Sequence, residues 1–446
     1  MINPTIFREY DIRGIAETDL TDENVYLCGR GFGSYYISQG TKKVIIGRDV
    51  RLSSPRITEA LQKGLNDSGC EVIEIGEVPT PILYFALYYY NIGSGIMITA
   101  SHNPKEFNGF KICLNKSTIY GEELQKLRGI IEEKKFSSGK GSVEKRNIIP
   151  AYIDHVTQQV KIKRKLKVIF DTGNGTCGPI IEQMMKRMPV EYDILFKEPD
   201  GNFPNHLPDP TVVKHISKLI EAVKKNEVDC GIGFDGDGDR IGVIDENGEI
   251  VWGDILLAIY AESVLKIIPG AKIIFEVKCS KGLIERIEEL GGTPLMYKTG
   301  HSLIKAKMKL ENSPLAGEMS GHIFFADKYY GFDDALYACL RLLEILGDNE
   351  KLSALANKVP KYYSTPEIRI ETTDEKKFEI VERFKESFKK TYKVIDIDGV
   401  RIDFSDGWGL IRPSNTQPVL VLRFEAKTEK RLEEIKRLFF DKLEKM

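Results

Sequence analysis

Three aspartates separated only by glycines are the residues whose spacing most clearly suggests chemistry. Asp235, Asp237 and Asp239 follow an apolar run in the segment DCGIGFDGDGDRIGVID (229–245). Three carboxylates this close would repel one another unless a cation lay among them, and the glycines let the backbone curl so that their oxygens converge. Oxygen ligands without histidine or cysteine favour Mg²⁺. The spacing therefore predicts a loop that binds a divalent metal.

Three other interpretations of this loop are possible. An EF-hand starting at Asp235 would place Glu246 correctly, but Arg240 stands where that loop requires glycine, and both flanks resemble strands rather than helices. A phosphatase of the haloacid dehalogenase kind also has Asp-x-Asp after a strand, but threonine or valine would be expected in place of Asp239, in a site near the chain start. The third interpretation is a solvated acidic turn. The metal loop is favoured over all three.

A second segment, ITASHNPKEFNGFK (98–111), places Ser101 and His102 in a polar turn after a strand. A serine beside a histidine is often only a turn, and no GxSxG elbow supports acyl chemistry. A serine hydroxyl near Mg²⁺ is, however, a plausible phosphoryl carrier, because the metal offsets phosphate charge. Lys111 is either a further charge or proton shuttle for that transfer or a solvated strand lysine.

Two more segments suit a phosphorylated sugar. In GEMSGH (317–322), Glu318 and Ser320 could accept and donate hydrogen bonds to vicinal hydroxyls. RPSNTQP (412–418) gathers the guanidinium of Arg412 with hydroxyls, an amide and backbone N–H groups, a set that suits a dianionic phosphate. A rigid proline-containing turn is the alternative for the second segment.

The elements that must position these segments alternate as in an α/β protein up to about residue 360. Predicted strands include 43–47, 71–76, 95–100, 167–171 and 271–278. From Ile368 the order is a strand, a helix (375–391), three strands and a final helix (428–445), which predicts an α+β domain. The polar stretch FSSGKGSVEKRN (136–147) is interpreted as a linker. The predicted domains are 1–150 with the serine loop, 151–252 with the metal loop, 253–363 with the sugar-binding loop and 364–446 with the phosphate-binding loop.

Composition excludes several classes of protein. The 446 residues carry a formal net charge of −2, so neither a nucleic-acid nor a membrane-surface protein is indicated. Seven scattered cysteines without a CxxC motif suit a reducing cytoplasm. Proline, asparagine and glycine interrupt the apolar stretch 81–100, and the start has no signal-peptide pattern, so no membrane association is expected. The sequence specifies no oligomeric state.

Together these segments resemble the α-D-phosphohexomutase superfamily, most closely its bifunctional phosphomannomutase/phosphoglucomutase branch. The matching segments, in order, are YDIRG (10–14), GRDVRLSS (47–54), TASHNP (99–104), DGDGDR (235–240), KTGHS (298–302), GEMSGH (317–322) and RPSNTQP (412–418). One departure is Gln417, where many relatives carry glutamate, and it unsettles only the outer contacts of that loop.

The resemblance implies three similar mixed α/β domains and a C-terminal α+β domain around a central active-site cleft. It implies a phosphoserine at Ser101, with Mg²⁺ held by Asp235, Asp237, Asp239 and an oxygen on Ser101. The other residues carried over are Lys111 and His301 as acid/base groups, Tyr10 and Arg13 near the phosphoserine, Arg240 and Lys278 lining the cleft, Glu318, Ser320 and His322 at the sugar, and Arg412, Ser414, Asn415 and Thr416 at the second phosphate.

The activity so implied is reversible conversion of hexose 1-phosphate and hexose 6-phosphate, of mannose or glucose or both, through a 1,6-bisphosphate that also serves as activator. Phosphoglucosamine mutase is the alternative within the superfamily, although GEMSGH rather than a GEQSGH-type loop argues for a hydroxylated sugar. A Mg²⁺-dependent sugar-phosphate phosphatase would share the metal loop. A sugar-phosphate-binding regulator would need neither Ser101 nor the three aspartates.

Overall fold

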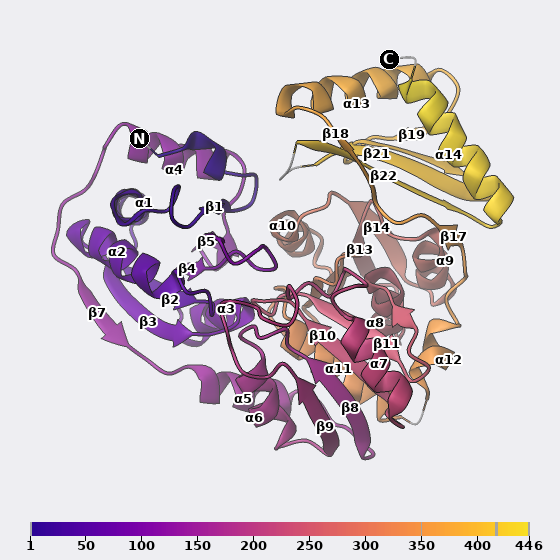
Figure 1. Ribbon diagram of the computed structural model, residues 1–446, viewed down its shortest axis with the longest axis horizontal. Helices are drawn as coiled ribbons and strands as arrows, with labels where there is room; N and C mark the ends of the chain where they lie inside the picture. The colour runs from indigo at the N-terminus through magenta and orange to yellow at the C-terminus, as the bar shows by residue number, and fades with distance from the viewer. Residues whose placement is uncertain (1, 349, 415–417, 445–446) are drawn as a thin grey trace. The chain divides into compact units, whose positions relative to one another are not determined.

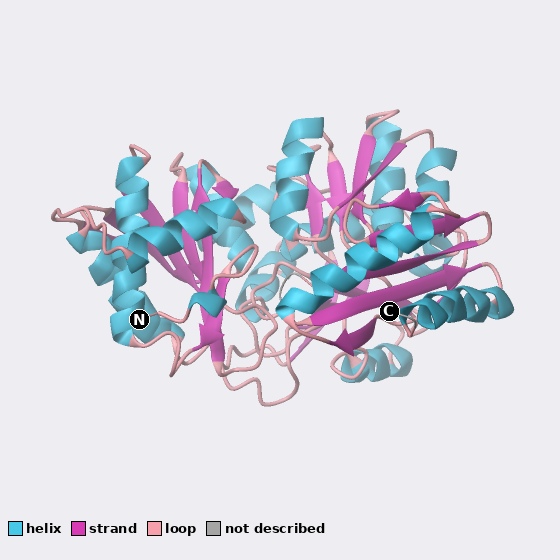
Figure 2. Cartoon of the chain, turned by 90° about the horizontal axis from the view of Figure 1, so that it is seen from above, coloured by secondary structure: helices cyan, strands magenta, loops and turns pink. Residues whose placement is uncertain are grey.

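The computed structural model describes residues 2–348, 350–414 and 418–444 and comprises two compact units (Figures 1 and 2). Unit 1 consists of Met1–Trp252 and Ser320–Ser353, and unit 2 of Gly253–Met319 and Ala354–Met446. Both combine sheets with helices, which confirms the predicted α/β class. The four predicted domain ranges remain a proposal, and part of the third, residues 320–353, falls in unit 1.

The N-terminal part of unit 1 is built on a mixed sheet with strand order β1-β5-β4-β2-β3-β7, to which β6 adds beside β5. Its elements are η1 (Pro4–Ile6), β1 (Ile12–Ile15), α1 (Asp22–Ser38), β2 (Lys43–Arg48), α2 (Ser54–Asp67), β3 (Glu71–Glu77), α3 (Thr80–Tyr89), β4 (Ser94–Ile98), β5 (Phe107–Leu114), β6 (Ser117–Thr118), α4 (Glu122–Glu132) and β7 (Ser142–Lys145). Helices α1, α2 and α4 share one apolar core with β2, β4 and β5, and α3 packs against β2 and β4 (Figure 1).

Strand β7 corrects the linker expected over residues 136–147. Ser142–Lys145 runs parallel to β3, with Ser142 opposite Glu71, and its side chains are exposed. A strand added at the edge of a sheet needs only backbone hydrogen bonds, so its sequence can stay polar and lack the apolar alternation that identifies inner strands.

The second sheet of unit 1 has the order β12-β11-β10-β8-β9. Its elements are α5 (Ile149–Gln158), β8 (Leu166–Asp171), α6 (Gly178–Met185), β9 (Val190–Leu195), α7 (Ser217–Lys225), β10 (Cys230–Phe234), β11 (Ile241–Asp245) and β12 (Ile250–Val251). The antiparallel pair β11–β12 confirms the hairpin that Asn247-Gly248 predicts. Later in the chain, β16 (Ile323–Phe325) and α11 (Ala335–Leu346) also belong to unit 1, and α11 packs against β11 and α5.

Unit 2 begins with parallel strands in the order β14-β13-β15. Its first elements are α8 (Gly253–Ile267), β13 (Lys272–Glu276), α9 (Lys281–Glu289), β14 (Thr293–Tyr297), α10 (His301–Glu311) and β15 (Leu315–Gly317), and the short helix α12 (Leu352–Ala356) lies where the chain re-enters this unit.

The C-terminal part of unit 2 is an antiparallel sheet with the order β17-β22-β21-β20-β19, and β18 also pairs with β22. Its elements are β17 (Tyr363–Ser364), β18 (Ile368–Glu371), α13 (Asp374–Lys389), β19 (Val394–Ile395), β20 (Val400–Phe404), β21 (Gly407–Pro413), β22 (Val419–Ala426) and α14 (Glu429–Leu443). Phe384, Phe424 and Phe439 belong to a core that both helices share with one face of this sheet (Figure 2). The short strand β19 is added to the three strands that the sequence predicts between the helices.

Within the described residues, no helix is both long and apolar enough to cross a membrane. All seven cysteines are buried and carry free thiols.

Candidate active site

The three predicted metal ligands lie in the loop that joins β10 to β11. The loop opens where Phe234 pairs with Ile241, and the amide of Asp235 donates to the carbonyl of Arg240 at 3.2 Å. Oδ1 of Asp235 accepts from the amides of Asp239 (3.0 Å) and Arg240 (3.1 Å), so this carboxylate caps its own loop. Asp235, Asp237 and Asp239 are fully buried, and one oxygen of each lies within 4.8 Å of the others.

The intervening glycines are needed for close approach. A Cβ at Gly236 would lie 2.6 Å from the carbonyl oxygen of Ser101, so any other residue there would push the serine loop away. Gly238 has a φ of +72°, a conformation that side chains disfavour.

Ser101 follows β4, in the loop that leads to β5, and contacts the metal loop directly. Its Oγ donates to Oδ2 of Asp235 at 2.7 Å and lies 3.0 Å from Nδ1 of His102. Its own φ is +51°, which is unusual for a residue with a side chain, and its amide donates to Oγ1 of Thr99 at 2.9 Å. The structure therefore brings the hydroxyl of Ser101 to the carboxylate of Asp235, which lies 134 residues away in the sequence.

Lys111, on β5, completes this cluster. Its Nζ lies 2.7 Å from Oδ2 of Asp237 and 2.5 Å from Oδ2 of Asp239. Burial alone would lower the pKa of Lys111, but the two carboxylates outweigh it and raise the pKa, so the side chain is an ammonium. The interpretation of Lys111 as a solvated strand lysine is wrong, because its side chain is buried.

The carboxyl groups of the cluster differ in how readily they ionise. Burial and the charges of Asp239 and Asp237 raise the pKa of Asp235 well above its usual range. Burial and Asp239 also oppose ionisation of Asp237, but Lys111 outweighs them and lowers its pKa. Three converging carboxylates whose charge one ammonium offsets only in part fit a divalent cation that prefers oxygen ligands.

Arg13, on β1, reaches the serine loop. Its Nη1 donates to Oδ1 of Asn103 at 2.7 Å and its Nη2 to Asp11 at 2.6 Å. Tyr10 is buried just before this strand. Loss of hydration and the charges of Arg240 and Arg13 lower the pKa of His102 well below its usual range, so its imidazole is neutral beside Ser101.

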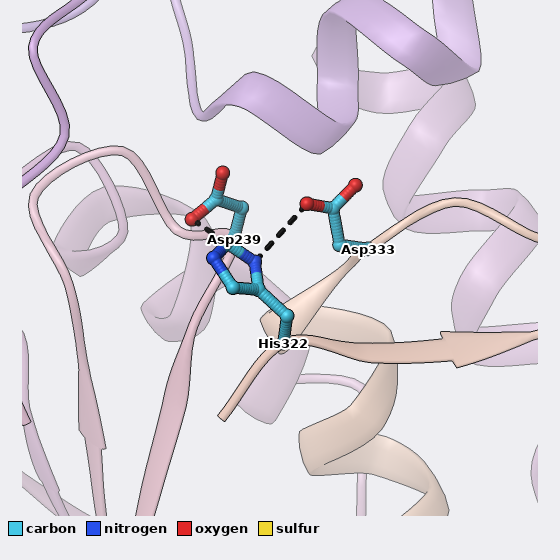
Figure 3. A group of neighbouring side chains, drawn as sticks. All are labelled: Asp239, His322 and Asp333. Atoms are coloured by element: carbon cyan, nitrogen blue, oxygen red, sulfur yellow. Dashed lines mark ion pairs between the residues drawn. The ribbon is translucent and has the colours of Figure 1, made fainter. Parts of the chain in front are cut away.

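Arg240 and His322 meet at the end of the metal loop. Nε of Arg240 donates to Nε2 of His322 at 2.9 Å, so a neutral His322 ring carries its proton on Nδ1. That Nδ1 lies 3.1 Å from Oδ2 of Asp333 and 3.6 Å from Oδ1 of Asp239 (Figure 3). Figure 3 shows the ring between the two carboxylates. Ser320 is half-buried in the same unit.

The remaining candidates belong to unit 2. Nζ of Lys278 lies 2.7 Å from Oε1 of Glu367 and 3.8 Å from Oε1 of Glu276. Burial would lower the pKa of Lys278, but these carboxylates raise it, and the lysine in turn holds the pKa of Glu367 at about 2. Oε1 of Glu318 accepts from the amide of Gly300 at 2.5 Å.

His301 begins α10 directly after Gly300, which places it beside the sugar-binding loop. Arg412 is the last residue but one of β21, next to Pro413, and its Nε donates to Oδ2 of Asp398 at 3.0 Å. The same oxygen accepts from the amide of Thr299, which ties the segment before His301 to the phosphate-binding segment. Ser414 is buried, and its amide donates to the carbonyl of Val419 at 2.9 Å. Asn415 and Thr416 lie outside the described residues.

Three residues that the sequence does not single out as site residues support these groups. Thr80 donates to Asp237 at 2.6 Å, Asp333 faces His322, and Arg51 is buried beneath the serine loop. Arg51 belongs to the segment GRDVRLSS that the resemblance singles out, so that motif was the available signal. Thr80 and Asp333 stand in apolar or aromatic surroundings that offered none.

Comparison with known proteins assigns the family. Models of the phosphoglucomutase/phosphomannomutase family match four successive parts of the chain: the alpha/beta/alpha domains I, II and III over 4–138, 150–248 and 252–363, and the C-terminal domain over 367–442. The chain belongs to the phosphoglucomutase/phosphomannomutase family. The predicted resemblance to this superfamily is thereby confirmed.

Relatives within the phosphoglucomutase/phosphomannomutase family match the chain over nearly its full length. It is 48% identical to a phosphomannomutase/phosphoglucomutase of Pseudomonas syringae pv. tomato, over 99% of this chain and 96% of that protein. It is 44% identical to a phosphoglucomutase of Neisseria gonorrhoeae, over 98% and 96%. A crystal structure of a family member from Burkholderia thailandensis superposes with a TM-score of 0.94 at 41% identity, over 99% of this chain and 97% of that one.

Proposed function

We propose that this protein is a phosphohexomutase that reversibly interconverts the 1- and 6-phosphates of mannose, glucose or both. One observation carries the proposal: Oγ of Ser101 lies 2.7 Å from Asp235, inside a buried cluster of three carboxylates and a lysine. A hydroxyl held against a candidate cation site suits a phosphoryl carrier. The named mutases among the relatives support the same reaction.

In the proposed reaction the phosphate on Ser101 is transferred to a sugar hydroxyl. The bond between phosphorus and Oγ breaks as a bond to the hydroxyl oxygen forms, the hydroxyl proton passes to a basic side chain, and Oγ regains a proton from an acidic one. The resulting 1,6-bisphosphate turns over, and the reverse transfer moves its other phosphate to Ser101. Phosphate and protons are therefore conserved over the cycle.

We propose that Asp235, Asp237, Asp239 and the phosphate on Ser101 hold Mg²⁺. When bound, the ion would offset negative charge on the transferring phosphoryl group. A glucose or mannose 1,6-bisphosphate is the proposed activator, because it can phosphorylate Ser101 when the serine has lost its phosphate.

The other candidate residues receive proposed roles from their chemistry. Lys111 is the proposed acid, since the neighbouring carboxylates keep it protonated, and His301 is the second acid/base candidate. Arg13, through Asn103, and Tyr10 would support the serine loop, and Arg240 would stabilise charge on the phosphoryl group. In the same proposal, Lys278 lines the substrate site and Glu318, Ser320 and His322 hold the sugar hydroxyls. The distal phosphate is bound by Arg412, Ser414, Asn415 and Thr416.

The distal site has to accept a phosphate attached to either end of the sugar, because the bisphosphate turns over between the two transfers. A guanidinium with hydroxyl and amide donors binds phosphate from either direction, whereas an apolar wall would match one orientation of the ring. We also propose a cytoplasmic location, which the seven free thiols support.

The replacement Ser101→Ala tests the proposal. Purified wild type should interconvert mannose 1-phosphate and mannose 6-phosphate with Mg²⁺ and a trace of glucose 1,6-bisphosphate, and Ser101→Ala should lose turnover but still bind sugar phosphate. The exposed Ser38 on α1 provides a matched control, since Ser38→Ala should change neither property. Near-normal turnover in Ser101→Ala would refute the phosphoserine role.

The substrate class is tested by comparing kcat/KM for mannose 1-phosphate, glucose 1-phosphate and glucosamine 1-phosphate while inorganic phosphate is followed in parallel. Comparable values for the first two, with little activity on the third, are expected. Preference for the amino sugar would identify a phosphoglucosamine mutase, and steady phosphate release without isomerisation would identify a phosphatase.

A further inference from the structure

The loop that carries Ser101 rests on a buried arginine. Arg51 lies between β2 and α2, and its side chain has no exposed surface. Its Nε donates to Oδ2 of Asp49 at 3.0 Å. The other guanidinium donors all go to backbone carbonyls of the serine loop: Nη1 to Pro104 (2.6 Å) and Phe107 (3.0 Å), and Nη2 to Ser101 (2.9 Å) and Asn103 (2.7 Å).

This arrangement uses all five N–H donors of the guanidinium. Four of them are spread across seven residues of one loop, so the loop backbone takes its shape from a rigid planar group. A lysine could not replace it, because an ammonium offers three donors from one point.

The side chain of Arg51 is itself fixed by residues outside the serine loop. The carboxylate of Asp49 accepts hydrogen bonds from Nε and from the backbone amide of Arg51, both at 3.0 Å. It also accepts one from Oγ of Ser54 at 2.7 Å. The ring of Phe203 lies 5.3 Å from the guanidinium carbon. A Cβ at Gly201 would lie 2.9 Å from Cα of Arg51, so the backbone there is closely packed as well. The guanidinium therefore has little room to move when the loop changes its chemical state.

The serine loop needs such support for two reasons. Ser101 has a φ of +51°, a left-handed conformation that residues with a side chain rarely adopt and that the surrounding structure must therefore hold in place. Its Oγ must also point at Asp235, in the next domain range, both with and without a phosphate attached.

We propose that Arg51 is a positioning residue for phosphoryl transfer, which holds the backbone of residues 101–107 so that Oγ of Ser101 faces the acidic cluster throughout the cycle. The inference rests on the proposed function, because it assigns Arg51 a part in that reaction. Arg51 acts through its hydrogen bonds to the loop carbonyls. The carboxylate of Asp49 balances the positive charge of its buried guanidinium.

Arg51→Lys tests the proposal, with Arg56→Lys as the matched control. Arg56 also donates to backbone carbonyls, those of Leu20 and Ala16, and pairs with Asp22, but none of its partners belongs to the serine loop. We expect Arg51→Lys to lower kcat by about 100-fold with KM changed less than about threefold, since a misplacement of about 1 Å is enough for such a loss. Arg56→Lys should keep both parameters.

Hydrogen exchange of backbone amides supplies a readout independent of turnover. Arg51→Lys should increase exchange in residues 101–107, and Arg56→Lys only around residues 16–20. Equal kcat in the two variants, or unchanged exchange in residues 101–107, would overturn the proposal. If wild type shows no mutase turnover, the proposed function fails while the exchange data still decide whether Arg51 holds the loop.

Asp49→Asn is the second variant that tests the proposal, for use if Arg51→Lys does not fold. It keeps the guanidinium beneath the loop but removes the carboxylate that orients it. A lower kcat at nearly constant KM, with increased exchange in residues 101–107, is expected, and wild-type values for both would overturn the proposal.

Discussion

The hydroxyl of Thr80 donates a hydrogen bond of 2.6 Å to Oδ2 of Asp237, and the amide of Thr80 donates to the carbonyl oxygen of the same residue at 2.7 Å. Thr80 is the first residue of α3, and Asp237 is the middle acid of the loop between β10 and β11. A helix of the first domain range therefore orients a candidate metal ligand of the second.

Thr80→Val should weaken binding of Mg²⁺ by about tenfold or more, because it removes the hydroxyl while keeping the branched shape, and outer-shell hydrogen bonds of this kind contribute at that scale. Titration calorimetry with Mg²⁺ on dephosphorylated protein measures the effect. Thr80→Ser retains the hydroxyl and should bind as wild type does. Equal affinities in the valine and serine variants would show that the hydrogen bond has no such role.

Lys111→Met should show whether Lys111 both competes with Mg²⁺ for the carboxylates and moves a proton in the reaction. The lysine lies within 2.7 Å of both Asp237 and Asp239 and competes with any cation for their charge, so its removal should tighten binding of Mg²⁺. The same change should lower kcat by at least about 100-fold if Lys111 moves a proton in the reaction. Calorimetry and steady-state kinetics on one preparation test both. Weaker metal binding together with normal kcat would contradict both parts.

Asp333→Asn should disturb the ring of His322. The hydrogen bond from Arg240 requires a lone pair on Nε2, and the carboxylate of Asp333 favours the proton on Nδ1 (Figure 3). The neutral amide would let the ring adopt the opposite tautomer, which cannot accept from Arg240. We expect nitrogen chemical shifts of the ring to change and kcat to fall by about tenfold. Asp348→Asn, at an exposed position, is the control. Unchanged nitrogen shifts of His322 in Asp333→Asn would contradict the role of Asp333 in setting the tautomer.

Asp334 predicts a pH dependence of stability. It accepts hydrogen bonds from the hydroxyls of Tyr152 and Tyr329 and from the amide of Tyr337, but burial raises its pKa to about 6. The folded state therefore favours the protonated carboxyl. The stabilisation that the protonated Asp334 carboxyl gives the folded state is fully present below its pKa in the unfolded chain, which is about 3.9. It is lost as pH rises through about 6, which lowers the free energy of unfolding by about 3 kcal/mol.

The difference in Tm between wild type and Asp334→Asn isolates this group from the other carboxylates. Measured from pH 4.5 to 7.5, wild type should lose stability relative to the variant as pH rises. A difference that stays constant over this range would contradict the assignment.

Much of the site could be predicted because its chemistry is local in the sequence. Asp235, Asp237 and Asp239 stand within one five-residue loop, and the strands on both sides carry clear β patterns. Helix ends were predicted to within a few residues for similar reasons. The final helix, for example, begins at Glu429, where Thr428 accepts from the amide of Arg431 as an N-cap.

The supporting residues could not be predicted because their role depends on distant partners. Thr80 and Asp237 are 157 residues apart, and Arg51 donates to carbonyls 50 to 56 residues away, where no side-chain pattern marks the accepting residues. Strand β7 could not be predicted for a related reason: its stability comes from backbone pairing with β3, so its composition can stay polar.

The discontinuity of unit 1 limits how such a gene can be recombined. The chain enters unit 2 after Trp252, returns to unit 1 at Ser320 and leaves it again after Ser353. A crossover that exchanged 253–363 between two relatives would place a foreign α11 in unit 1, where Asp334 must accept from Tyr152. Chimaeras should therefore survive best when residues 320–353 are inherited together with 1–252, although the two stretches are separated in the gene.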